Sequence, residues 1–299
     1  MIVIFVTLMA GRNVFIAAVI DDIDGISLAM GTAVVGFLVA GGLRVLRQGT
    51  RLGYDLRPRL PRFIILGIGT AFGLAGANLA LGQLSPVLFT LMDISLYPVL
   101  VSVIGRVLVQ DEEIRLRRIF PLLGLAALGI LLFSWHDLQG DALGGSVQGF
   151  FWTALSVAGW ATSVIMISQL VRQGTPVLDV ISFRFTLTPF LLAPLLVFSP
   201  ATTAFAPSDL PAVIILGALG YAIPFMFSFT GLRNISVITF SIYTMLTPVF
   251  TFIFASWLLD EPPLTALQIL GALIIFAALL GRTADQYRQR QRAPTLQES

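Results

Sequence analysis

The sequence predicts an all-α integral membrane protein, with ten transmembrane helices arranged as two inverted five-helix repeats around a central cavity. Three observations predict this architecture. Of 299 residues, 57% are hydrophobic and only 11% are charged, and the mean hydropathy is +0.91, so there is too little polar surface to cover a water-soluble globule. Ten apolar stretches are each long enough to cross the roughly 30 Å hydrocarbon core as a helix. One pattern also occurs twice along the chain.

The predicted spans follow one another through short links that leave little chain for a soluble domain. Their runs are continuously apolar and too long for the alternating strands of a membrane barrel. We place them at 1–20, 25–45, 62–82, 85–109, 117–134, 146–170, 177–198, 211–231, 234–258 and 264–282.

The repeated pattern is a long apolar helix with a central proline, an Asp-Glu pair, and then a shorter apolar helix with a glycine. Pro98 and Pro248 stand 150 positions apart, which is half the chain. We therefore divide the chain into residues 1–140, the first repeat, and 141–299, the second repeat with a short cytoplasmic tail. The other paired features are Asp111-Glu112 with Asp260-Glu261 and Gly124 with Gly271.

The arginines in the links, in the tail and at the span ends that flank them all fall on one side of the membrane. By the positive-inside rule that side is the cytoplasm, which places both termini there. The opposite links contain acidic residues and no arginine. The cytoplasmic set is Arg44, Arg47, Arg51, Arg57, Arg59, Arg62, Arg106, Arg115, Arg117, Arg118, Arg172, Arg233, Arg282, Arg288, Arg290 and Arg292, and the external set is Asp21, Asp22, Asp24, Asp137, Asp141, Asp209, Asp260 and Glu261.

Five helices per repeat is an odd number, so the second copy enters the membrane from the opposite face. Inverted repeats of this kind are typical of secondary transporters, in which two like halves exchange roles between outward-open and inward-open states. The pattern therefore predicts alternating access.

Charged and amide side chains near the middle of the membrane are the first candidates for a substrate site. Arg12 and Asn13 lie in the first span, and an arginine at that depth costs roughly 2.5 to 3.5 kcal/mol on insertion scales, so it must face protein or a watery cavity. Arg12 either binds an anionic group such as a carboxylate or pairs with an internal acid. Asp93 in the fourth span has the same depth; it either pairs with Arg12 or titrates and couples transport to protons.

The remaining cavity candidates are polar or aromatic residues placed by depth and by the repeat. Tyr97 follows Asp93 by one helical turn, and Tyr243 stands 150 positions after Asp93. Trp160 occupies the position equivalent to Arg12, where it is either an aromatic wall for an amphipathic small molecule or, as is more common for a tryptophan in a helix, a packing residue. Pro98 and Pro248 each remove a helical hydrogen bond and mark either a hinge or gate beside the cavity or a static bend. The full set of cavity candidates is Arg12, Asn13, Asn78, Asp93, Tyr97, Trp160, Tyr221, Tyr243, Thr244 and Thr247.

Two further features have structural explanations. Gly69 and Gly73 form a GxxxG spacing, which predicts close helix packing in the third span. For Arg184, about 10 Å from the cytoplasmic edge by helical rise, we favour a structural role over substrate binding.

Composition argues against catalysis. There is no cysteine and a single histidine, His136, so no metal site, no catalytic triad and no cofactor are expected. Asp111 and Glu112 are neighbours on a turn and do not face each other, which excludes paired acid-base work. We expect no enzyme activity, although a lipid-modifying membrane enzyme and a non-transporting scaffold or receptor remain as alternatives from other classes.

Residues 236–280 carry a resemblance to a known family. Thr247-Pro248, then Asp260-Glu261, then Leu270-Gly271-Ala272 resemble the drug/metabolite transporter superfamily, in its ten-helix EamA branch. The weaker copy at 85–133 agrees. The resemblance implies a multi-pass protein of the bacterial inner membrane that exports amino acids or related metabolites, similar to exporters of aromatic and neutral amino acids.

The function expected from this resemblance is export of small metabolites, with membrane lipid as surroundings and no nucleic-acid partner. A proton-coupled drug or metabolite antiporter is the alternative transport mode. The sequence leaves open the substrate, the direction of net flux, the coupling ion, the resting conformation, and whether the protein is a monomer or a homodimer.

Overall fold

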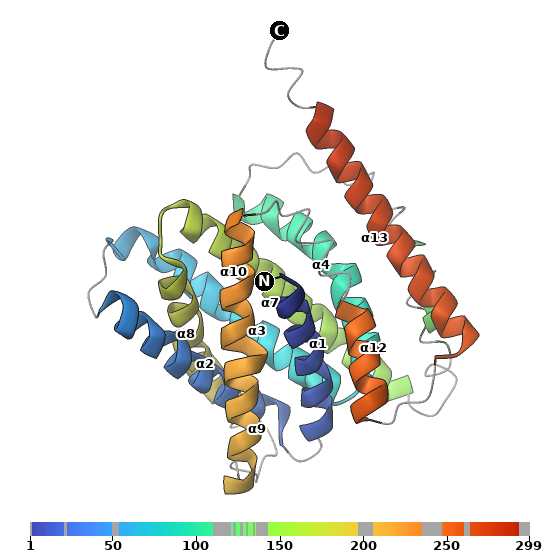
Figure 1. Cartoon of the computed structure of the whole chain (residues 1–299), viewed down its shortest axis with the longest axis horizontal. Helices are drawn as coiled ribbons and strands as arrows, with labels where there is room; N and C mark the ends of the chain where they lie inside the picture. Colours follow the sequence, from blue (N-terminus) through green and yellow to red (C-terminus); the bar gives the residue numbers. More distant parts are fainter. Residues whose placement is uncertain are drawn as a thin grey trace.

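Figure 1 shows a computed structural model of the chain, and every regular element in its described part is helical. The structure describes residues 2–20, 23–49, 54–109, 121, 124–125, 128–129, 131–133, 135, 143–196, 206–234, 247–259 and 264–292.

The helices of the first half match the predicted spans to within a few residues. A long apolar run in a membrane forms a helix because only there are all its backbone N–H and C=O groups hydrogen-bonded within the segment. Short helical turns precede α3. The elements are α1 (Ile2–Val19), α2 (Gly25–Gln48), η1 (Arg57–Arg59), α3 (Leu60–Leu81) and α4 (Pro86–Val109). The described residues of the fifth predicted span, 117–134, are helical too.

The second half contains the two longest described helices, α7 and α13. α9, η3 and α10 run on without a break, with a π-helical segment in the middle, and Figure 1 draws them as one long orange column. α13 continues past its predicted end through the basic residues that follow. The elements are α7 (Leu143–Arg172), α8 (Val177–Leu196), η2 (Pro207–Asp209), α9 (Leu210–Ile215), η3 (Leu216–Ala222), α10 (Ile223–Asn234), α12 (Thr247–Leu258) and α13 (Ala266–Arg292).

Six helices in the described part are long and apolar enough to cross a membrane: α2, α3 with η1, α4, α7, α8, and the run from η2 into α10. Three shorter apolar helices lie at Val3–Val19, Thr247–Leu258 and Ala266–Ala278. The protein is therefore a helical multi-pass membrane protein. The count of ten stays a prediction, because parts of the fifth and ninth predicted spans lie outside the described residues.

Local sequence signals fix where several helices begin and end. The Asp24 carboxylate accepts a hydrogen bond from the amide of Ser27 and caps α2. Thr265 and Gln268 bond reciprocally, side chain to backbone, at the start of α13, as a capping box does. Gly174, with φ at +77°, ends α7 in the left-handed conformation that glycine adopts without strain. These links are thus set by the sequence rather than by packing.

Contacts between the halves follow a mirrored pattern. α3 and α4 of the first half pack on α7, and the run from η3 to α10 and α12 of the second half pack on α1. α3 packs on α8, while α9 and η3 pack on α2. α2 and α8 pack on each other, as do α4 and α12.

The closest of these contacts joins α3 to α7 through glycines. A Cβ added at Gly73 would lie 2.7 Å from the Trp160 ring, and one at Gly69 would lie 2.8 Å from the carbonyl oxygen of Gly159. The close packing predicted from the GxxxG spacing is confirmed. It also sets Trp160 directly against α3, so the position of that ring is fixed by glycine on the neighbouring helix.

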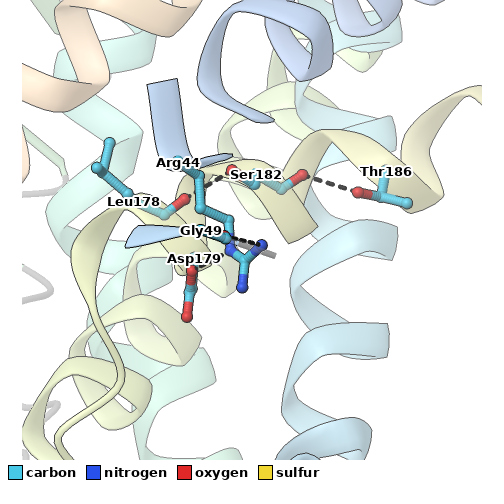
Figure 2. A network of polar contacts seen from close by, with 6 residues as sticks. All are labelled: Arg44, Gly49, Leu178, Asp179, Ser182 and Thr186. Carbon is cyan, nitrogen blue, oxygen red and sulfur yellow. Dashed lines mark hydrogen bonds and ion pairs between the residues drawn. The ribbon is translucent and has the colours of Figure 1, made fainter. Parts of the chain in front are cut away.

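Three arginines connect the halves at the end where α2 finishes and α8 starts. Figure 2 shows Arg44 of α2 reaching the carboxylate of Asp179 in the first turn of α8, where a negative charge also suits the helix dipole. Arg59 donates to the backbone carbonyl of Gln173, and Arg62 donates to the side chain of Gln169. On the orientation predicted from the arginines, this end faces the cytoplasm.

Candidate functional site: a buried polar centre

Arg12 lies in the middle of α1 and is only 3% exposed. Its Nε and Nη2 donate to the side-chain oxygen of Asn13 at 3.0 and 2.6 Å, and Asn13 Nδ2 donates to the Thr90 hydroxyl at 2.9 Å. Thr90 in turn lies 3.4 Å from the hydroxyl of Thr251. This polar chain crosses from α1 through α4 to α12, so it joins the two halves of the protein inside the membrane.

The aromatic ring of Tyr221 covers the other side of Arg12. The guanidinium carbon lies 5.0 Å from the ring centroid, within the range of a cation–π interaction. Gly220 makes this approach possible, because a Cβ there would meet the Arg12 side chain at 3.0 Å. Gly220 and Tyr221 both belong to η3. Pro224, which cannot donate a helical hydrogen bond, follows this segment. The π-helical turn thus places Tyr221 over Arg12.

A second buried arginine, Arg184 of α8, is 1% exposed and surrounded by aromatic rings. Its guanidinium carbon lies 3.9 Å from the Phe225 centroid, 4.9 Å from that of Trp160 and 5.8 Å from that of Phe185. Its Nε donates to the hydroxyl of Thr70 in α3 at 3.0 Å. We expected a structural role for Arg184, and the structure places its side chain inside the buried polar centre.

The rings connect the two arginines. Trp160 lies 6.4 Å from Tyr221 and 5.7 Å from Phe225, measured between ring centroids, and Tyr221 lies 6.4 Å from Phe225. We call Trp160, Tyr221 and Phe225 the aromatic cluster. It places a guanidinium at each end of one continuous aromatic surface.

Asp93 and Tyr97 face this centre from α4. Asp93 is half-buried, and it interacts electrostatically with Arg12 and with Tyr97. No ion pair or hydrogen bond joins Asp93 to Arg12 in the described part of the chain, so the direct pairing that their shared depth suggested does not occur in this structure.

Two ionic atoms in this centre lack partners. Arg12 Nη1 and Asp93 Oδ1 are both enclosed, and neither has a hydrogen-bond partner among the described residues. A buried polar atom without a partner costs roughly 1–3 kcal/mol, and more when it carries charge. Two guanidiniums against one carboxylate also leave the centre with an excess of positive charge. Its chemistry suits an anionic group.

The other predicted site residues are spread more widely. Asn78 lies near the far end of α3, where it donates to the Gly25 carbonyl and lies 3.4 Å from the Tyr221 hydroxyl, so it touches the centre only through that tyrosine. Thr247 is buried at the start of α12, and its carbonyl accepts from Thr251. Tyr243 and Thr244 lie outside the described residues.

The two predicted hinge prolines have different surroundings. Pro98 lies inside α4, whose helix continues on both sides of it. Pro248 is the second residue of α12 as the structure describes it, and the residues before Thr247 lie outside the described part.

Sequence reasoning missed Thr70, Thr90, Phe225 and Thr251. Threonine and phenylalanine are common in membrane helices, and only three-dimensional packing distinguishes these four from their neighbours. Arg184 did carry a signal, since an ionisable residue inside a span is itself a functional hypothesis.

A cavity of about 650 Å³ lies away from this centre, toward the end of the molecule where Arg62 bonds Gln169. α3, α4 and α7 form its walls. Its lining is Pro61, Arg62, Ile65, Leu108, Met166, Gln169, Arg172 and Gln173.

Buried charge inside a bundle of apolar helices is typical of membrane proteins that move polar solutes. Residues 147–283 match the EamA-like transporter family, which is a family of transporters and not of enzymes. Among the curated proteins, none matches. A solved structure described as "Crystal structure of protein" matches with a TM-score of 0.62 over 97% of this chain and 97% of that chain, at 16% sequence identity, which shows the fold alone.

Residues 147–283 are thus similar to the EamA-like transporter family, and the apolar helices around them indicate a multi-pass membrane protein.

Proposed function

We propose that the protein is a secondary transporter that exports small metabolites, and specifically aromatic or neutral amino acids, across the cytoplasmic membrane of a bacterium by alternating access. One observation carries the proposal: Arg12 Nη1 and Asp93 Oδ1 are both enclosed without partners beside the aromatic cluster. A free amino acid offers the complementary groups, since its carboxylate suits Arg12 and its ammonium suits Asp93. An aromatic side chain then packs on Trp160 and Phe225.

The packing of the helices supports alternating access. Most contacts between a helix of one half and a helix of the other have a counterpart with the halves exchanged, as α3 on α7 corresponds to η3 and α10 on α1, whereas α4 on α13 has none among the described residues. Two inverted repeats related by an axis in the membrane plane produce such a pattern. The division near residue 140 and the cytoplasmic position of both termini belong to the same proposal.

Flux measurements test the proposal. The purified protein is reconstituted in liposomes, and efflux of labelled tryptophan, phenylalanine, leucine, glutamate and lysine is followed with and without a pH gradient. We expect saturable, protein-dependent flux for the aromatic and neutral amino acids. Absence of such flux for all five would sink the proposal.

Asp93 supports a second mode, proton-coupled antiport of drugs or metabolites, because a carboxylate enclosed in the membrane beside one cation can exchange a proton during the cycle. Asp93→Asn separates the two modes. If the protein is a proton-coupled antiporter, flux through this variant no longer depends on the pH gradient. A variant with unchanged rate and unchanged pH dependence would exclude proton coupling through Asp93.

A non-transporting scaffold or receptor is the alternative from another class. The protein has no native cysteine, so single cysteines can be introduced on each side of the centre and their accessibility compared with impermeant reagents. Only a transporter needs both sides to open. Labelling from one side alone, under all substrate conditions, favours the scaffold.

A further inference from the structure

The cavity between α3, α4 and α7 has a lining that the buried centre does not explain. Arg62 and Arg172 supply positive charge, and Gln169 and Gln173 supply amides. The rest of the lining is apolar: Pro61, Ile65, Leu108 and Met166. Among the described residues that line it there is no aspartate or glutamate. A concave surface lined by one sign of charge concentrates counter-ions and raises their rate of association.

The three walls of this cavity continue to the buried centre. α4 runs from Leu108 to Tyr97, and α7 runs from Gln169 to Trp160, distances of about 16 and 14 Å by helical rise. α3 leads from Arg62 to Thr70, the partner of Arg184. The cavity and the centre are therefore two points on one path between the same helices.

Apolar side chains close the path between them. Val101 and Ile104 of α4 pack against the hydrophobic core, to which Met166 and Ile165 of α7 belong. Ile165 also reaches to 3.8 Å from the position of a Cβ on Gly105. These side chains form a plug about one helical turn thick, and the centre beyond it is enclosed.

We propose that this cavity is the cytoplasmic entrance of the transport path, and that Arg62 and Arg172 attract and hold the carboxylate of a substrate before the plug opens. This inference rests on the proposed export of amino acids and on the orientation given above. Arg62 is already fixed by Gln169 and by the Pro58 carbonyl, so its charge is held in place at the mouth. Arg172 is exposed at the end of α7.

Kinetics measured separately from each face test this inference. Inside-out and right-side-out vesicles containing the protein present the cytoplasmic and external faces, and zero-trans uptake gives KM and the maximal rate for each. For Arg62→Gln/Arg172→Gln we expect KM at the cytoplasmic face to rise roughly tenfold, with the external KM and the maximal rate unchanged. Arg62→Lys/Arg172→Lys keeps the charge and should restore most of the affinity. Arg47→Gln is the matched control, because Arg47 is exposed at the same end of the molecule and does not line the cavity.

The outcomes separate this inference from the function itself. If the unmodified protein moves no amino acid, the proposed function fails. Suppose instead that the unmodified protein transports amino acids. If the double glutamine variant then has an unchanged cytoplasmic KM, or a KM that rises equally at both faces, the cavity is not the cytoplasmic entrance. The inference also fails if the double glutamine variant loses maximal rate with an unchanged KM and the double lysine variant does not restore that rate. Such a result would assign a structural role to the two arginines.

Discussion

Gly159 of α7 lies against Gly69 of α3 so closely that neither has room for a side chain. A Cβ on Gly159 would also lie 2.5 Å from the amide nitrogen of Gly73. Because both neighbours are backbone atoms, the clash has no flexible side chain to relieve it. The two helices that support the aromatic cluster are thus held at a separation set by glycine.

We expect Gly159→Ala to destabilise the protein by about 1–3 kcal/mol or more, because an added methyl group overpacks this crossing. Thermal unfolding of the purified protein in detergent measures the effect. Gly42→Ala is the matched control: nothing lies within 4 Å of its Cβ position in α2, and alanine is the better helix former there. Equal stability of the two variants would contradict the close crossing.

Arg12→Gln should lower both stability and flux, because it leaves the Asp93 carboxylate in the membrane without the cation near it. Adding Asp93→Asn removes that uncompensated charge, so we expect the double variant to recover most of the lost thermal stability while flux stays low. Unfolding temperature and liposome flux are measured for the two single variants and the double. Strictly additive losses of stability would show that the residues do not interact.

Arg44→Gln and Asp179→Asn each break the ion pair between α2 and α8, whose side chains are 12% and 2% exposed. We expect each to lower the unfolding temperature, and the double variant to lose less than the sum, with a coupling of about 0.5–3 kcal/mol for residues in contact. The double-mutant cycle is read from thermal unfolding at low and high salt. A sum of independent effects would contradict the pairing.

Tyr54 lies beside this ion pair, in the link between α2 and α3. Burial, and then the nearby Asp179 carboxylate, raise the pKa of Tyr54 to about 12. Because the folded pKa is raised above the unfolded value of about 10, this tyrosine contributes stability below pH 10 that is lost as the pH rises toward 12. The difference in ultraviolet absorbance between the unmodified protein and Tyr54→Phe should show ionisation near pH 12. Ionisation near pH 10 would show that the phenol is free.

Pro98→Ala tests the hinge in α4. Alanine supplies the missing N–H to the carbonyl of Ile94, so we expect greater thermal stability and a turnover that falls several-fold if bending at this point is part of the cycle. Pro86→Ala is the control, because Pro86 opens the same helix, where a proline lacks no helical bond. Turnover that responds equally to both substitutions would argue for a static bend.

The sequence predicted helix positions well and helix rotations poorly. The ends of α2 and α3 fall within three residues of expectation, because apolar length and caps such as Asp24 are visible in one dimension. These helices are apolar on most of their surface, so periodicity does not say which side meets a neighbour. Hence Arg12 was identified as a buried charge, but its cover by Tyr221 and its link through Asn13 to Thr90 depend on rotations that only packing reveals.

The repeat was informative in a similar, limited way. It placed Trp160 at the position equivalent to Arg12, and the structure brings Trp160 into the centre, but against Arg184. It also paired Gly124 with Gly271, whereas Gly271 makes its close contact with Gly129. An offset along the chain relates positions in two copies and does not predict which positions touch.

The π-helical segment at Leu216–Ala222 has a consequence for how such proteins change over evolutionary time. A π turn holds one residue more than an α turn, so deleting a single residue there converts the segment to a regular helix while the helices on either side keep nearly their original rotation. Such a deletion would change the local position of Tyr221 over Arg12 without moving the rest of the bundle. The segment is thus a place where the cover of Arg12 can change in one mutational step while the fold is kept.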